Sequence, residues 1–190
     1  MTLALTAHRL EFTVEALTPV ALNEHQGAAL RGALFHALRG QERGSWAGFC
    51  VQKHLASCAE CMAVAACPVA ALVSTLDPAA ERGRDVPRPY VIEPPLDGRT
   101  RLAARERLVF GITLFSHALA LFPYVILALR ALEEVGLGKV VGEAGWRRGK
   151  VRLVGAQATN PLTGARQEWE AERAKREAEL DRRAVTGGSP

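Results

Sequence analysis

Four cysteines, the entire cysteine content of this 190-residue chain, are the residues whose types and spacing most clearly suggest chemistry. They are Cys50, Cys58, Cys61 and Cys67, with the spacing C-x7-C-x2-C-x5-C. Four thiolates satisfy a tetrahedral soft cation, and the Cys58-x-x-Cys61 pair can wrap two ligands round one ion. A shell of four cysteines leaves no position open for water. The spacing therefore predicts a structural metal, with zinc as the first assignment.

Two alternatives to zinc stay open at this point. The dipeptide Cys67-Pro68 matches the end of the cysteine runs that bind iron–sulfur clusters, so a cluster competes with zinc. Four unrelated buried cysteines are the simplest alternative. His54 lies inside the same segment, where it either replaces one cysteine as a ligand or stands at the surface.

Two histidines near the first predicted helix provide candidate acid–base groups. His36 lies on the polar face of that helix with Arg39 one turn further on, and His25 precedes the helix. A histidine beside basic residues can take a proton from a ribose 2′-OH, while an arginine stabilises the charge that develops on the phosphate. The competing interpretation is an ordinary solvated histidine on a helix.

A glycine-rich basic segment, residues 136–153, joins the second predicted long helix to the last predicted strand. It carries one aromatic and several basic side chains, namely Lys139, Trp146, Arg147, Arg148 and Lys150. Lysine and arginine bind phosphates, and a tryptophan stacks on a base, so the segment is a candidate RNA-binding loop. The formal net charge of +4 is compatible with an anionic partner. An ordinary basic surface hairpin is the alternative.

Hydrophobic periodicity predicts the elements that must position these residues. The order is strand, helix, strand, strand, helix, strand, over residues 8–17, 27–40, 88–95, 107–115, 121–136 and 149–157. This is the split βαβ pattern of an α+β fold of the ferredoxin-like (RRM-like) type, βαββαβ. The fold class alone does not assign a function.

The predicted organisation is one domain over residues 1–164 with a cysteine-rich insertion at 41–88, followed by a charged helix and flexible tail at 165–190. The insertion has few hydrophobic anchors, so a metal would supply the missing stabilisation. No apolar run reaches the ~20 residues of a membrane span, and the start lacks the features of a secretory signal. We expect a cytoplasmic protein with no membrane partner, whose clustered cysteines bind metal rather than form disulfides.

Several blocks, taken in order, carry a family resemblance. They are "GAALRGALFHALRG", the cysteine segment that ends in "CPVAAL", "RPYVIEPP", "LVFGITLFSHALALFPYVILALRALEEVGLG" and "VRLVGAQATNPLTG". Over about residues 8–164 the chain resembles the endoribonucleases of the RAMP superfamily that process CRISPR repeat RNA (pre-crRNA). The resemblance implies metal-independent cleavage, in which a 2′-OH attacks the adjacent phosphate and leaves a 2′,3′-cyclic phosphate and a 5′-OH. It also implies a histidine base on or near the first helix, with His36 the best match and His25 the reserve.

Relatives of this type usually carry a second ferredoxin-like domain, whereas this chain changes to a charged segment at Ala165. We expect a second copy of the chain, or other CRISPR effector subunits, to complete the RNA-binding surface. Two other functions stay open. One is a non-catalytic RNA-binding or assembly subunit of a CRISPR effector complex, and the other is an interaction module built on zinc or an iron–sulfur cluster. Salt-sensitive RNA binding would separate the RNA-binding functions from the interaction module.

Overall fold

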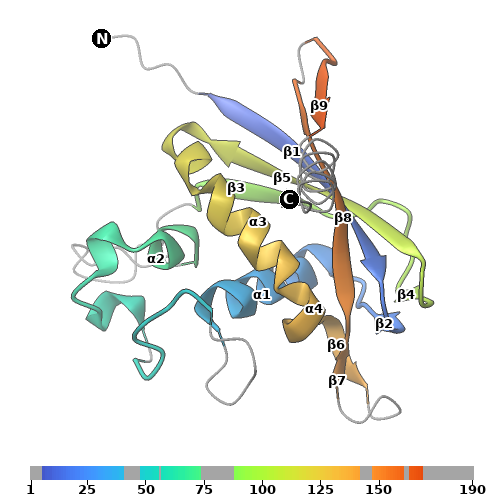
Figure 1. The fold of residues 1–190 in the computed structure, drawn as a ribbon, viewed down its shortest axis with the longest axis horizontal. Coiled ribbons are helices and arrows are strands. Elements are labelled where there is room, and N and C mark those ends of the chain that lie inside the picture. The colour runs from blue at the N-terminus through green and yellow to red at the C-terminus, as the bar shows by residue number, and fades with distance from the viewer. Residues whose placement is uncertain are drawn as a thin grey trace, which may run out of the picture.

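The computed structural model describes residues 6–40, 48–55, 57–73, 88–141, 147–160 and 163–168. It contains a five-stranded antiparallel sheet with the strand order β3-β5-β1-β8-β9 (Figure 1). The strands are β1 (Ala7–Ala16), β3 (Tyr90–Glu93), β5 (Arg107–Phe115), β8 (Val151–Thr159) and β9 (Arg166–Glu168). The long helices are α1 (Gln26–Arg39), α3 (Phe122–Arg130) and the short continuation α4 (Leu132–Val135). Without β9, the sheet order is β3-β5-β1-β8, with α1 between β1 and β3 in the chain and α3 and α4 between β5 and β8. This arrangement confirms the predicted ferredoxin-like α+β fold.

Alternation along β1 builds the core. Leu10, Phe12 and Val14 point to one side of the sheet and are at most 6% exposed. The helices α1 and α3 lie on that side (Figure 1). The buried stripe of α1 consists of Leu30, Ala33, Leu34, Ala37 and Leu38, as the helical periodicity predicts. Burying these apolar faces against each other supplies the main stabilising term of the fold.

The second predicted helix is present but is interrupted. A 3₁₀ turn (Ser116–Leu121) leads into α3, and α4 follows after Ala131. Pro123 stands in the first turn of α3, where the missing N–H costs nothing. Gly136, at φ = 79°, ends α4.

Two small ribbons lie beside the main sheet, and neither appears as a strand pair in the sequence pattern. One pairs β2 (Val20–Ala21) with β4 (Arg101–Leu102). The other pairs β6 (Leu137–Val141) with β7 (Arg147–Gly149), so the basic segment is a hairpin. The two ribbons are in close contact, because a Cβ at Gly138 would lie 2.2 Å from the carbonyl oxygen of Ala21.

The charged helix predicted from residue 165 does not begin there. Arg166–Glu168 form β9, which pairs antiparallel with β8 from Thr159 to Gln157. The last residues of β8 pair with β1 on one edge only, and β9 pairs with the backbone groups of the other edge, so tertiary pairing outweighs local helix propensity. The predicted domain boundary at residue 164 therefore falls inside a hairpin of the sheet, and the rest of the predicted helix lies outside the described residues. Within the described part of the chain, no helix is long and apolar enough to cross a membrane.

Gly138→Ala should destabilise the protein far more than Gly98→Ala. Both glycines have positive φ, +86° and +70°, but only Gly138 lies against backbone, whereas nothing lies within 4 Å of the Cβ position at Gly98. We expect a loss of about 1 kcal/mol at Gly98 from backbone strain alone. At Gly138 the clash adds to that strain, for a total of about 3 kcal/mol. Chemical denaturation measures both values, and equal losses would show that the two ribbons are not in contact.

Candidate metal centre and nucleic-acid interface

Three of the four cysteines recur with a period of three residues. Cys58 begins the 3₁₀ turn η1 (Cys58–Glu60), and Cys67 follows the turn η2 (Val64–Ala66). The Cys61 N–H donates to the Cys58 carbonyl at 3.1 Å, the Val64 N–H to Cys61 at 3.0 Å, and the Cys67 N–H to Val64 at 3.4 Å. Each 3₁₀ turn ends at a cysteine in an extended conformation, Cys61 after η1 and Cys67 after η2. The two short turns therefore fold the segment back on itself and bring its cysteines close together.

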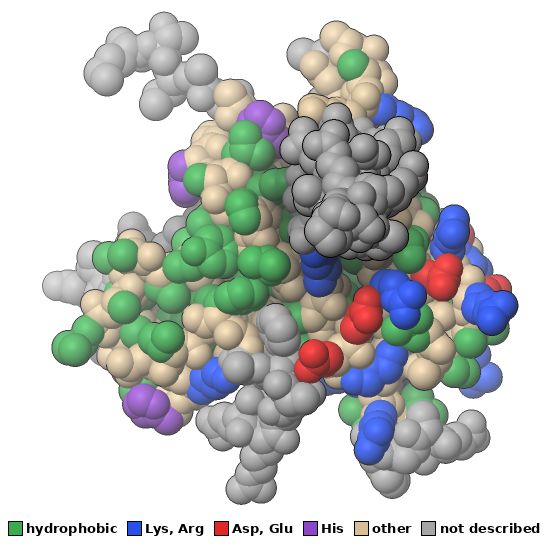
Figure 2. Space-filling model, viewed as in Figure 1, with side chains coloured by type: hydrophobic (Ala, Val, Ile, Leu, Met, Phe, Trp, Pro, Cys, Tyr) green, Lys and Arg blue, Asp and Glu red, His purple; other side chains and the backbone are tan. Residues whose placement is uncertain are grey.

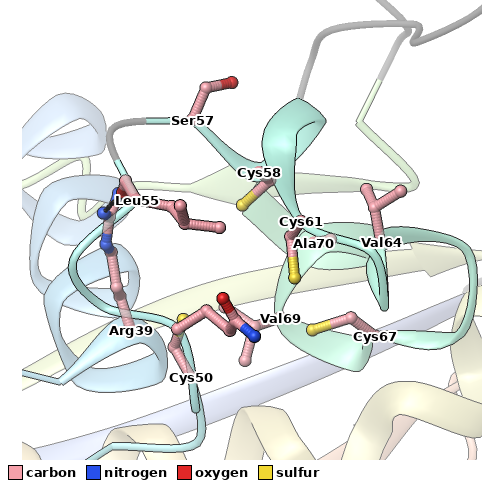
Figure 3. Close-up of a pocket in the computed structure, with 11 residues that line it drawn as sticks. Arg39, Cys50, Leu55, Ser57, Cys58, Cys61, Val64, Cys67, Val69 and Ala70 are labelled. Carbon is pink, nitrogen blue, oxygen red and sulfur yellow. Dashed lines mark hydrogen bonds between the residues drawn. The ribbon is translucent and has the colours of Figure 1, made fainter.

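Cys50 reaches the same place from the other direction. The Phe49 N–H donates to the Leu38 carbonyl at 2.8 Å, which fixes the chain where it returns past the end of α1. All four cysteines line one cavity of about 20 Å³, and Figure 3 shows their thiols turned toward it. The four thiols are free and partly buried. A cavity of that size is comparable to the space that one water molecule needs.

The donor set fits a soft cation. The pKa of the Cys58 thiol lies above its ordinary value, first because burial disfavours the thiolate and then because Cys50 stands nearby, with Arg39 acting in the opposite direction. Within the described residues no three His, Cys, Asp or Glu side chains already stand at ligand spacing around one point. The thiols would therefore have to close on an ion as it binds. His54 is exposed and does not line the cavity.

The insertion is anchored in the main core more firmly than its composition suggested. Helix α2 (Pro68–Val73) buries Val69 and Leu72 almost completely in the core cluster. The ring of Phe49 meets Tyr124 of α3 edge-on, with centroids 5.8 Å apart. These contacts hold both ends of the described cysteine segment against the helices.

Arg39 is one wall of the cysteine cavity. Its guanidinium donates to the carbonyl oxygen of Lys53 at 3.1 Å and also to that of Leu55, and it lies 5.8 Å from the Phe35 ring centroid. The sequence suggested a contact between Arg39 and RNA phosphate. The structure instead shows these donors bound to the backbone of the cysteine segment, which gives Arg39 a structural role.

His36 is half-buried on α1, between the cysteine segment and the basic hairpin. Its pKa lies below the ordinary value because burial disfavours the imidazolium, and the charges of Arg148 and Arg39 act in the same direction. A lowered pKa keeps the ring neutral at pH 7, which a general base requires. His36 also meets the ring of Phe35 edge-on.

His25 stands at the other end of the same helix. It is the N-cap residue of α1, its side chain is 77% exposed, and its Nε2 lies 3.7 Å from Glu24. The eleven-residue separation from His36 corresponds to about 16 Å along the helix. The two candidate histidines therefore cannot act on one phosphate as an acid–base pair.

The basic side chains of the hairpin fall into two groups: two donate hydrogen bonds to backbone carbonyls, and two are exposed to solvent. The guanidinium of Arg148 donates to the Gly138 carbonyl at 2.6 Å, and the ammonium of Lys150 donates to the Glu134 carbonyl. Lys139 and Arg147 are exposed. Trp146 lies outside the described residues. The hairpin thus presents Lys139 and Arg147 to solvent, while Arg148 and Lys150 hold it in place.

The open face of the sheet is not a base-stacking surface. RRM proteins stack bases on aromatic side chains of the two central strands. Here the central positions of β1 and β5 on that face are Glu11, Thr13, Gly111 and Thr113. Glu93 lies across Gly111 and binds Arg9 at 2.7 Å and the Thr113 hydroxyl at 2.6 Å. The centre of this face therefore offers no aromatic side chain on which an RNA base could stack.

A run of arginines that the sequence patterns did not single out leads into β5. Arg99, Arg101, Arg105 and Arg107 fall within nine residues, from the turn before β4 to the first residue of β5, and all four are exposed. Their spacing was the available signal. Unlike the glycine-rich segment, this run has no aromatic residue among its basic ones, so it lacks the combination typical of an RNA-binding loop.

Arg39→Ala should loosen the cysteine segment. The change removes two charged hydrogen bonds to partly buried carbonyl groups, at an expected cost of about 2–3 kcal/mol in the free energy of unfolding. Arg31→Ala is the matched control, because Arg31 is exposed on the same helix and should change stability by less than about 0.5 kcal/mol. Denaturant unfolding gives both values, and limited proteolysis should cut the Arg39→Ala variant near residues 53–55. Equal free energies of unfolding for the two variants would contradict a structural role of Arg39.

The chain was compared with curated proteins, with solved structures and with protein-family models. A search of curated proteins gives no match. Among solved structures, a chain in the "Crystal structure of Csm3-Csm4 subcomplex in the type III-A CRISPR-Cas interference complex" matches with a TM-score of 0.55 and 18% sequence identity, and the match covers 95% of this chain and 98% of that chain. At this identity the likeness concerns the fold. The family model AF_1859_N, described as an N-terminal domain, matches residues 5–180. Because that match spans most of the sequence, the chain belongs to the AF_1859_N family.

Proposed function

We propose that this chain is a CRISPR-associated RNA-binding subunit of an effector complex of the RAMP type. The observation that carries the proposal is the fold shared, over nearly the full length of both chains, with a subunit of a CRISPR-Cas interference subcomplex. The AF_1859_N match adds a family but no activity. The partners would be CRISPR repeat RNA and other effector subunits.

The β6–β7 hairpin is the RNA contact in this proposal. Lys139 and Arg147 are exposed on it, and Arg148 and Lys150 fix its position through backbone carbonyls. Phosphate contacts by such cations supply sequence-independent affinity that weakens as salt rises. The open face of the sheet carries glutamate and threonine at its centre, so it is less suited to stacking RNA bases than the hairpin is to binding phosphates.

A structural metal at the four cysteines is the second part of the proposal. Cys50, Cys58, Cys61 and Cys67 would hold zinc, which would cross-link the segment after α1 to the segment before α2. An iron–sulfur cluster is the alternative for the same donors. The convergence of all four side chains on one small cavity supports this assignment.

Processing of precursor CRISPR RNA by cleavage is a second candidate function, and His36 is the observation in its favour. A neutral His36 would take the proton of a ribose 2′-OH, and the oxygen would attack the adjacent phosphorus. The P–O5′ bond would break, the 5′-oxygen would gain a proton, and a 2′,3′-cyclic phosphate would remain. Arg39 and Arg148 both act on the charge of His36, and both donate to backbone carbonyls, so either would have to use its remaining N–H groups to stabilise the developing charge. Of the two candidate histidines, His25 is too distant from His36 to protonate the leaving oxygen, which is why a binding role comes first.

RNA binding and cleavage can be tested in one assay with labelled repeat RNA in EDTA. We expect wild-type protein to bind without cutting, with affinity that falls as salt rises. The Lys139→Glu/Arg147→Glu variant should lose more than about tenfold in affinity and have a salt dependence reduced by about one unit of slope per contact. Gel shifts over a salt series and mapping of the RNA ends give both results.

The control for that assay is Arg31→Glu, which places the same change of charge on exposed residue 31 of α1. A single cut that leaves a cyclic phosphate, that disappears in His36→Ala and that weakens as His36 is protonated at low pH would establish the endoribonuclease instead. A wild-type protein that neither binds nor cuts would leave the metal-based interaction module as the remaining function.

Cys61→Ser should release the metal and lower stability. The wild-type protein should contain about one zinc per chain, whereas the variant should contain almost none and should lose several kcal/mol of stability. Elemental analysis and thermal unfolding measure these quantities, and Ser57→Ala, on the cavity wall but without a soft donor, is the control. Iron and sulfide in a brown protein would assign a cluster. Full metal content in Cys61→Ser would exclude Cys61 as a ligand.

A further inference from the structure

The β2–β4 ribbon and the turn that follows it display the arginine run at the surface. Arg101 lies on β4, and Arg105 lies in the turn that leads to β5. Both side chains are exposed. The exposed residues between them are Ala103 and Ala104, so the turn offers charge and almost no apolar area.

Hydrogen bonds to β1 and within the turn fix its shape. The Arg105 N–H donates to the Ala16 carbonyl at 2.7 Å, and the Ala16 N–H donates to the Glu106 carbonyl at 2.9 Å. The carboxylate of Glu106 accepts the Ala103 N–H at 2.6 Å. Glu106 is therefore used to close the turn, and the turn presents Arg105 from a fixed backbone.

Arg105 holds a backbone conformation that favours glycine. Its φ is +73°, one of two positive values among the described non-glycine residues. Such a conformation is costly for a residue with a Cβ, and it persists where the surroundings or a function require it. Nothing in the turn uses the Arg105 side chain, so the fold gives no reason for an arginine in place of glycine.

The four arginines differ in how their charges are balanced. Arg99 pairs with Asp97 at 2.8 Å, and Arg107 lies 3.8 Å from Glu15. For Arg101 and Arg105 the described residues show no ion pair. Two uncompensated cations thus stand between two paired ones.

This arginine surface is continuous with the basic hairpin. Arg101 pairs through its backbone with Ala21, and the Ala21 carbonyl lies against Gly138, which precedes Lys139. Figure 2 shows lysine and arginine side chains, with some acidic side chains among them, on the side of the molecule where the two small ribbons lie. A single polyanion could contact the hairpin and the turn together.

We propose that Arg101 and Arg105 form a second contact site for the RNA phosphate backbone, next to the β6–β7 hairpin. This inference rests on the proposed RNA-binding function and gives the RNA a path from the hairpin across the β2–β4 ribbon. An acidic protein is the less suitable partner, because protein interfaces have an apolar core and this turn offers only alanines. A charged surface without apolar anchors suits phosphates, which position a nucleic acid without reading its sequence.

The test compares Arg101→Ala, Arg105→Gly and the double variant with Arg31→Ala, by binding to single-stranded repeat RNA over a salt series. Each change should weaken binding about fivefold at low salt and reduce the slope of log affinity against log salt by about 0.7. Arg105→Gly removes the charge and also relieves the positive φ, so its thermal midpoint should equal or exceed that of wild type. Weaker binding by a protein that is at least as stable cannot come from misfolding.

Several results would overturn the inference. If wild type and the Arg31→Ala control bind RNA and the hairpin variant does not, but the Arg101 and Arg105 variants keep full affinity and slope, the RNA does not cross this turn. If poly-glutamate competes as well as RNA of equal charge, the surface belongs to acidic proteins. If wild type binds no RNA at all, the proposed function falls and this inference falls with it.

Discussion

The burial of one face of β1 is the constraint on which the rest of the molecule depends. β1 pairs with β5 on one side and β8 on the other, and its inward side chains Phe12 and Val14 are fully buried. Those side chains determine which face α1 and α3 must cover. Once both helices lie there, α1 also contacts β6, and the candidate sites lie along α1.

Helix α1 therefore serves two sites with residues one turn apart. Arg39 faces the cysteine cavity and binds carbonyls of the insertion, and the Arg148 charge of the hairpin reaches His36. The proposed metal centre and the proposed RNA surface thus share one rigid element. Closure of the thiols on an ion would stabilise the end of α1 that carries His36 and Arg39, without any metal at the RNA itself.

The sequence was sufficient for the elements with a long, regular pattern. Alternation over residues 8–17 gave β1, and the buried stripe of α1 followed the helical period, because both elements have one face in the core. The ribbon of β2 and β4 could not be predicted from the sequence, since each strand has only two residues and two residues show no hydrophobic period. Arg166–Glu168 form a strand because β8 has a free edge, and helix propensity, which depends on local sequence alone, contains no information about that edge. At the site, the clustering of the cysteines was visible, but the role of Arg39 depended on a backbone 14 residues away that only folding brings close.

The three-residue spacing of Cys58, Cys61, Val64 and Cys67 has a consequence for the tolerance of this segment to mutation. Each of these residues is joined to the next by one backbone hydrogen bond across three positions. Substitutions at the exposed positions between the cysteines, such as Met62, leave those backbone bonds intact. A single inserted or deleted residue would break one of them and displace the later thiols from the cavity. The segment should therefore vary freely in composition while its length stays fixed.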